Sequence, residues 1–94
     1  MASFQFLVEE VFTIDGVKGV FASGMVESGR VDPCDIACLN GDPSKECKIR
    51  RIEGPRLLLD YAKKGANVAL LLEGIDVDAV SAGDRISFVR PSNP

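Results

Sequence analysis

Carboxylates are the side chains of this sequence with the most evident capacity for chemistry. The 94 residues include 14 acidic and 11 basic side chains and no histidine. Glu9, Glu10 and Glu53 are the obvious acid/base candidates, because a Ser/His or Cys/His pair requires an imidazole. Neighbouring carboxylates on a strand more often face solvent or bind a turn than act in catalysis. We therefore expect no catalytic residue and no enzymatic activity.

Cofactor and metal sites are not expected either. The polar segment 41–48, GDPSKECK, lacks the G-x-x-x-x-G-K-[ST] pattern that cradles phosphates. Cys34, Cys38 and Cys47 form an odd set, and no histidine is present to complete a Cys3His zinc site. Free cysteines in a reducing compartment behave as small hydrophobes in or near strands, which is the reading we favour. A disulfide between Cys34 and Cys38 stays open, because spacing alone does not define its geometry.

The basic side chains gather in one part of the chain. Residues 45–64 contain seven basic and three acidic side chains, so this segment carries +4 while the whole chain carries -3. Such a segment can contact phosphate locally, although the acidic remainder opposes long-range attraction of nucleic acid, and we expect no DNA binding. Solvated surface charges are the alternative. The candidates for phosphate contact are Lys18, Lys48, Arg50, Arg51 and Arg56.

Short strands must position these side chains. Turn signals recur about every ten residues with β-rich segments between them, which predicts an all-β barrel or sandwich. Residues 8–29 read as two strands around a turn at Asp15-Gly16. In 47–52, CKIRRI, a bulge near Arg50-Arg51 would bring both isoleucines to one side. The segment 55–64, PRLLLDYAKK, suits either a short helix or extended chain.

Two short segments share a pattern. VDPCDI (31–36) and VSAGDRI (80–86) each contain an apolar residue, a turn, an aspartate and a β-branched residue. We expect Asp35 and Asp84 to accept hydrogen bonds from nearby backbone as each turn enters a strand. The pattern favours shared turn chemistry over duplication.

The chain length predicts one domain over residues 1–94, with a core of about 6–91. The longest aliphatic run, 68–72, is far below the roughly 18 residues of a membrane span, and no signal pattern follows Met1. We expect a cytoplasmic protein without a membrane partner.

Three stretches carry a resemblance to a known family. They are EEVFTI (9–14), G-x-x-x-x-G-x-V-x-S-G (19–29) and IEGPRLLLDYAKKGANVALLLEGI (52–75) followed by AGD (82–84). In this order, and over about 6–91, the chain resembles the second domain of translational GTPases, with the closest likeness to elongation factor Tu. The resemblance implies a small closed antiparallel β-barrel, and extended chain in 55–64.

The resemblance also implies a role. In that family the second domain packs against a nucleotide-binding domain and touches ribosomal RNA, and in elongation factor Tu it holds the 3′ adenosine of aminoacyl-tRNA. It implies a non-catalytic module that contacts the tRNA acceptor end or ribosomal RNA. The alternative is a protein-interaction barrel that docks on a GTPase domain, in cis or in trans, and has lost RNA binding.

Eight positions match the family's acceptor-end site. Candidates for the adenosine pocket are Glu9, Glu10, Phe12, Ile14, Phe21, Glu53 and Leu71, and Asn67 matches a residue beside the aminoacyl ester. Apolar side chains there would enclose a base, and Glu53 would accept a hydrogen bond. The alternative places the four apolar side chains in the barrel core.

The chain departs from the family pattern around this site. The turn GVKG, with Lys18, replaces a shorter GRG, Pro55 replaces a large side chain, and Met25 replaces an arginine. Family positions that are basic correspond here to Glu73, Asp76 and Ala82. Together with Asp78 they make an acidic loop, and carboxylates that face phosphates oppose binding.

Overall fold

The protein is built almost entirely of β-strands. The computed structural model describes residues 4–88, which form eight strands and one short 3₁₀ helix. The elements are β1 (Phe4–Phe12), β2 (Val20–Val31), β3 (Ile36–Leu39), β4 (Asp42–Glu53), β5 (Leu58–Leu59), β6 (Ala62–Lys63), β7 (Asn67–Glu73), η1 (Val77–Ala79) and β8 (Arg85–Phe88). Both Met1 and the expected core limit at residue 91 lie outside the described residues.

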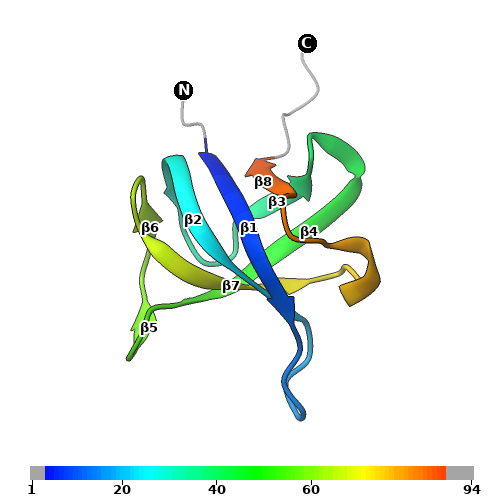
Figure 1. Cartoon of the computed structure of the whole chain (residues 1–94), viewed down its shortest axis with the longest axis horizontal. Coiled ribbons are helices and arrows are strands. Elements are labelled where there is room, and N and C mark those ends of the chain that lie inside the picture. The colour runs from blue at the N-terminus through cyan, green and yellow to red at the C-terminus, as the bar shows by residue number, and fades with distance from the viewer. Residues whose placement is uncertain (1–3, 89–94) are drawn as a thin grey trace.

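Six of the strands close into a ring. They follow the order β1-β8-β3-β4-β7-β2, and β2 pairs again with β1, with every pairing antiparallel (Figure 1). The expected closed antiparallel barrel is therefore confirmed. Strands β5 and β6 lie outside the ring, where they pair with β4 and β2. Segment 55–64 is thus extended chain and turn, as the resemblance implied, and not a helix.

A bulge keeps the core side chains of β4 inside the ring. The register of β4 against β7 shifts between Ile49 and Arg51, as the sequence predicted. Ile49 and Ile52 both point inward and are fully buried because of this shift. Burying a side chain of this size contributes about 1.5–3 kcal/mol, so the two isoleucines are strong anchors of the strand.

A second bulge lies in β1 and was not expected. The register of β1 against β2 shifts between Val8 and Glu10. Gly24 on β2 allows this close approach, because a Cβ there would lie 1.9 Å from the carbonyl oxygen of Leu7. Beyond the bulge the alternation is inverted, so Val11 packs against the core while Phe12 points outward.

The two halves of the barrel have equivalent registers. Strand β1 corresponds to β4, β2 to β7, and β3 to β8. The pair of Val8 with Gly24 in the first half is therefore equivalent to the pair of Ile49 with Leu72 in the second. Both bulges occur at this position. Strands β3 and β8 are equivalent to each other and also pair with each other. The central pair of their register joins Cys38 to Ser87, which are equivalent positions of the two halves. The barrel therefore has an approximate internal two-fold symmetry.

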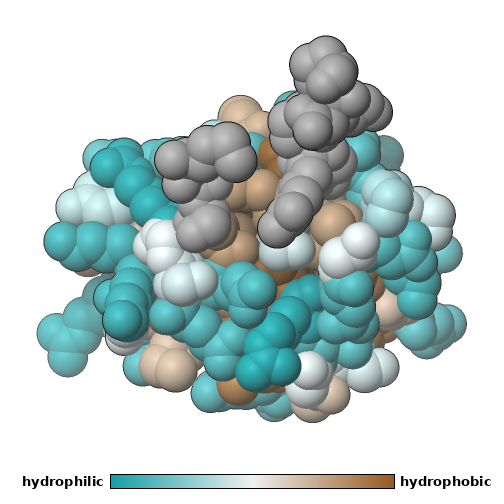
Figure 2. Space-filling model, turned by 90° about the horizontal axis from the view of Figure 1, so that it is seen from above, coloured by the Kyte–Doolittle hydropathy of each residue, from teal (hydrophilic) through white to brown (hydrophobic). Residues whose placement is uncertain are grey.

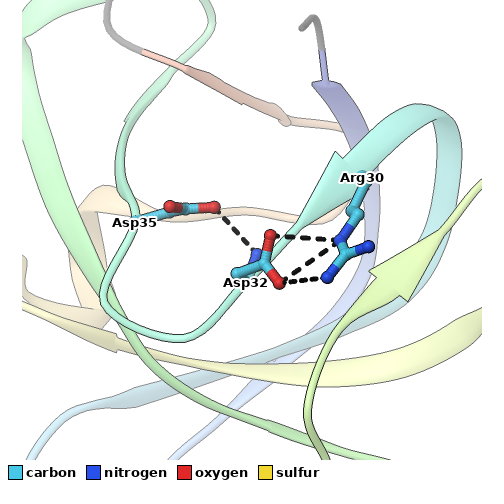
Figure 3. A network of polar contacts seen from close by, with 3 residues as sticks. All are labelled: Arg30, Asp32 and Asp35. Carbon is cyan, nitrogen blue, oxygen red and sulfur yellow. Dashed lines mark hydrogen bonds and ion pairs between the residues drawn. The ribbon is translucent and has the colours of Figure 1, made fainter.

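The two aspartate turns are equivalent parts of these halves. The backbone N–H of Asp32 donates to Asp35 Oδ2 at 2.8 Å (Figure 3), and that of Ser81 donates to Asp84 Oδ2 at 2.9 Å. Both predicted bonds are confirmed. In each turn the N–H two residues further on donates to a carbonyl of another strand, from Cys34 to Ile49 and from Gly83 to Val8. The shared pattern thus reflects equivalent places in the fold, and turn chemistry alone does not account for it.

Arg30 adds an ion pair to the first of these turns. Its guanidinium contacts the Asp32 carboxylate, with Nη2–Oδ1 at 2.8 Å (Figure 3).

Figure 2 shows hydrophilic residues over most of the face seen from above, with apolar residues between them. No polar or charged side chain among residues 4–88 is buried.

The three cysteines are free thiols in two environments. Cys38 and Cys47 are buried in strands, as expected for small hydrophobes, and burial raises the pKa of the Cys47 thiol to about 11. Cys34 is exposed, so the expectation is wrong for this residue. It occupies a turn with a φ of 76°, in the place where the other half has Gly83 with a φ of 94°.

Candidate functional site

The outer face of four adjacent strands carries most of the candidate site residues. The registers of β1, β2, β7 and β4 align Phe12 with Phe21, Phe21 with Leu71, and Leu71 with Arg51. The next row pairs Glu10 with Ser23, Ser23 with Ala69, and Ala69 with Glu53. Adjacent positions on these strands belong to the core, so both rows point away from it. Residues that are distant in the sequence therefore share one surface.

An apolar cluster occupies one end of this face. The rings of Phe12 and Phe21 are stacked, with centroids 5.2 Å apart and an interplanar angle of 10°. Phe21 and Leu71 are 1% and 2% exposed, whereas Phe12 is 36% exposed. The backbone of the β1–β2 loop lies against Leu71, since a Cβ at Gly19 would come within 2.9 Å of its Cδ1.

The alternative that placed these apolar residues in the barrel core is wrong for Phe12 and Ile14 only. Phe21 and Leu71 are buried, but neither belongs to the interior cluster. Phe12 and Ile14 are exposed, and Ile14 lies in the loop after β1 with 45% of its surface accessible. Phe12 is thus the member of the cluster that can offer a ring face to a ligand.

Next to the cluster is a shallow depression of about 280 Å³. Its rim includes the predicted residues Glu9, Glu53 and Asn67, and also Pro55, which replaces a large side chain of the family. The remaining lining residues are Ser23, Gly24, Gly54, Val68 and Ala69. The floor is made of small residues, so a planar group can lie close to the sheet.

Arg51 connects the cluster with the depression. Its Nε lies 2.9 Å from Glu53 Oε2, although the N–H is not directed at the carboxylate, and its guanidinium carbon lies 6.0 Å from the centre of the Phe21 ring. The sequence predicts Arg51 only as a phosphate contact and does not predict Ser23. Both could have been found, because side chains two positions apart on a strand point to the same face. Arg51 is two positions from Glu53, and Ser23 is two positions from Phe21.

The other phosphate-contact candidates do not gather on this face. Arg50 Nη1 forms an ion pair with Glu73 Oε2 at 2.9 Å, so part of the acidic loop neutralises it. Lys18, Lys48 and Arg56 are exposed, and none of them has an ion-pair partner among residues 4–88. They lie in the β1–β2 loop, on β4 and before β5.

The electrostatics of the depression favour hydrogen-bond donors. Glu9 and Glu53 are acceptors when ionised, while the Asn67 amide and the Ser23 hydroxyl both donate and accept. Phosphate groups are disfavoured beside the Glu9 carboxylate, which has no ion-pair partner among residues 4–88, whereas the Glu53 carboxylate is paired with Arg51. Within the described part of the chain, no group of three or more His, Cys, Asp or Glu side chains is placed to hold a metal ion. No helix of this part is long and apolar enough to cross a membrane.

The closed ring has the fold that the resemblance to the second domain of translational GTPases implied. Among solved structures, the chain is similar to the crystal structure of translation elongation factor SelB from Methanococcus maripaludis in its apo form, with a TM-score of 0.80 and 23% sequence identity. The similarity covers 93% of this chain and 19% of that one, so the chain spans about a fifth of that protein. At this identity the comparison establishes the fold. No family model matches the chain.

Proposed function

We propose that this barrel is a non-catalytic, translation-factor-like module that binds the end of an RNA strand on the outer face of β1, β2, β7 and β4. The RNA is the tRNA acceptor end or an unpaired part of ribosomal RNA. The observation that carries the proposal is the convergence of Glu9, Glu53 and Asn67 on one depression beside the Phe12–Phe21 stack. These residues come from the four strands β1, β2, β4 and β7, and Glu9 lies at the bulge of β1.

The chemistry of the face suits one unpaired nucleoside. A base that stacks on the exposed side of Phe12 gains about 1–3 kcal/mol. Glu53 and Glu9 then accept hydrogen bonds from an exocyclic amino group or a ribose hydroxyl. The depression is too small and open for a double helix, so a splayed terminal nucleotide fits best.

Phosphates of the bound strand must lie away from the two carboxylates. Lys18, Lys48 and Arg56 are the candidates without an intramolecular ion pair in residues 4–88, and they lie on separate elements. Three phosphate contacts on a single strand give a slope of about −2 for log K against log salt concentration. This weak dependence separates the proposed mode from general electrostatic binding.

Amide chemical shifts of the labelled protein test the proposal. Aminoacylated and deacylated tRNA are titrated at 50 and 200 mM salt into the parent, Glu53→Ala and Asn67→Ala. We expect saturable shifts around Glu9, Glu53 and Asn67, and an affinity at least five-fold lower in each variant. Glu46→Ala is the matched control, since Glu46 is an exposed carboxylate on β4 that lies opposite Cys38. Equal binding by the parent and both variants would refute the RNA site.

A second candidate function is docking on a GTPase domain without RNA. The ion pairs of Arg50 with Glu73 and of Arg51 with Glu53 support it, because they reduce the positive charge available to phosphates. Saturable binding to an isolated GTPase domain in calorimetry, with no shift on addition of tRNA, is the result expected for this alternative.

A further inference from the structure

A short arm projects from the barrel and exposes apolar side chains. It comprises residues 54–65, and within the described residues 4–88 its strand β5 pairs only with β4 and its strand β6 only with β2, outside the ring (Figure 1). Leu57, Leu58 and Tyr61 are 65%, 59% and 41% exposed. Three large apolar residues are thus exposed within five positions of the chain, apart from the apolar cluster around Phe12, and such a group is unusual on the surface of a small domain.

The arm forms a groove of about 400 Å³. Residues 57–63 and Ala66 line it. The Arg30 guanidinium lies 4.1 Å from the centre of the Tyr61 ring, and Leu59 packs against the barrel core. These contacts hold both sides of the groove, so the apolar surface exists before any partner arrives.

The arm is also locally cationic. Arg56 precedes the exposed leucines, and Lys63 and Lys64 follow Tyr61, whereas Asp60 is the single acidic residue of 54–65. None of the three cations forms an ion pair among the residues that the structure describes. A complementary partner therefore offers an apolar side chain flanked by carboxylates.

The chain itself carries such a segment. Val77 in η1 is 40% exposed and stands between Asp76 and Asp78, and no residue of η1 is buried. The Asp76 carboxylate does not cap the helix. Neither aspartate forms an ion pair in the described part of the chain, so both remain available to an external cation.

The arm and η1 cannot meet within one molecule. The arm leads into β7 and η1 follows it, and the 7 residues of β7 span about 23 Å. Figure 1 shows the two features on opposite sides of the barrel. A contact between them must therefore join two molecules.

We propose that the arm binds the η1 segment of a second copy of this chain, in a head-to-tail arrangement. Val77 of one copy enters the groove beside Leu58 and Tyr61 of its neighbour, and Asp76 and Asp78 face the cationic rim. The contact is heterologous and leaves one arm and one η1 segment free on each dimer, so association continues beyond the dimer into rings or open chains. The proposed RNA-binding face takes only Gly54, Pro55 and Arg56 from the arm, whereas Leu58, Tyr61, Lys63 and Lys64 lie outside it.

Sedimentation equilibrium from 10 μM to 2 mM protein, at 20 and 500 mM NaCl, tests the proposal. We expect the parent to associate reversibly, with at least ten-fold weaker association at high salt. The variants Lys63→Glu/Lys64→Glu and Asp76→Lys/Asp78→Lys should each be monomeric, because arm and η1 then carry like charges. An equimolar mixture of the two should associate again, since both contacts regain opposite charges.

The mixture makes the test independent of damage to the fold. Amide spectra verify that each variant is folded, and Lys45→Glu/Lys48→Glu is the control, with the same charge change on β4. The control should associate like the parent. A monomeric parent at 2 mM in 20 mM NaCl, or folded variants whose mixture stays monomeric, would overturn the proposal. Glu53→Ala should associate normally, so failure of the RNA site and failure of this contact are distinguishable.

Discussion

The ring of Phe12 lies parallel to that of Phe21, with centroids 5.2 Å apart, on the outside of the barrel. Because Phe12 is 36% exposed, we expect Phe12→Ala to lower the free energy of unfolding by only about 1–2 kcal/mol. Phe6 is fully buried in the core, and Phe6→Ala should cost about 3–5 kcal/mol. Urea denaturation measures both, and equal losses would mean that Phe12 belongs to the core.

Gly24 is required by the bulge of β1. Its Cβ-sized space is filled by the Leu7 carbonyl oxygen, so Gly24→Ala must displace backbone. We expect a loss of about 3 kcal/mol or more, with the largest amide shift changes in β1 and β2. Gly16→Ala is the comparison, because no atom of residues 4–88, apart from its own chain neighbours, lies within 4 Å of the added methyl group there. That variant should cost only about 1–2 kcal/mol, from its positive φ. Similar losses for the two would contradict the role of the bulge.

The backbone of Cys34 is strained, and a glycine at this position would remove the strain. Its φ of 76° is favourable for glycine, and the equivalent residue of the other half is Gly83. Cys34→Gly should therefore raise the free energy of unfolding by about 1 kcal/mol, whereas Cys34→Ala should leave it nearly unchanged. Thermal unfolding in reducing buffer distinguishes the two. Destabilisation by glycine would show that the thiol contributes more than its backbone strain costs.

The buried Cys47 thiol makes stability depend on alkaline pH. Burial raises its pKa from an ordinary value of 9.0 to about 11. Between these values the unfolded chain loses the thiol proton while the folded chain keeps it, so stability is fully present below pH 9 and falls as the pH rises toward 11. The loss is on the order of 2 kcal/mol. Urea denaturation from pH 8 to 11 should show a smaller decrease for Cys47→Ala than for the parent, and parallel curves would contradict the assignment.

The strands and the β4 bulge could be predicted because their signals are local. In β4 the charged pair Arg50-Arg51 interrupts an apolar alternation, and only a bulge reconciles it with two buried isoleucines. In β1 the alternation of Phe4, Phe6 and Val8 continues through residues 10 and 12 and places Phe12 inside. The bulge at Glu9 inverts this order, and it depends on Gly24 of another strand. Sequence reasoning therefore had no local signal for it.

Several residues of the candidate site could be predicted from the sequence, but the ion pair that neutralises Arg50 could not. The resemblance supplied Glu53 and Asn67, and strand pairing brings them to one depression. The ion pair between Arg50 and Glu73 joins β4 to the end of β7, so it follows from a register that the sequence does not state. Arg51 and Glu53, by contrast, are two positions apart on one strand, and their contact follows from alternation alone.

Because the two half-barrels are equivalent, either half can come first along the chain and still give this fold. Strand β3 turns into β4 through Asn40-Gly41, and β8 pairs with β1 as β3 pairs with β4. Phe4 and Phe88 are close, with ring centroids 5.1 Å apart. A circular permutant that links the original ends and opens at Gly41 would begin with β4 and end with β3. The permutant retains every strand pairing of the barrel. Its chain runs through the same two halves in the opposite order, so it should fold to the same ring.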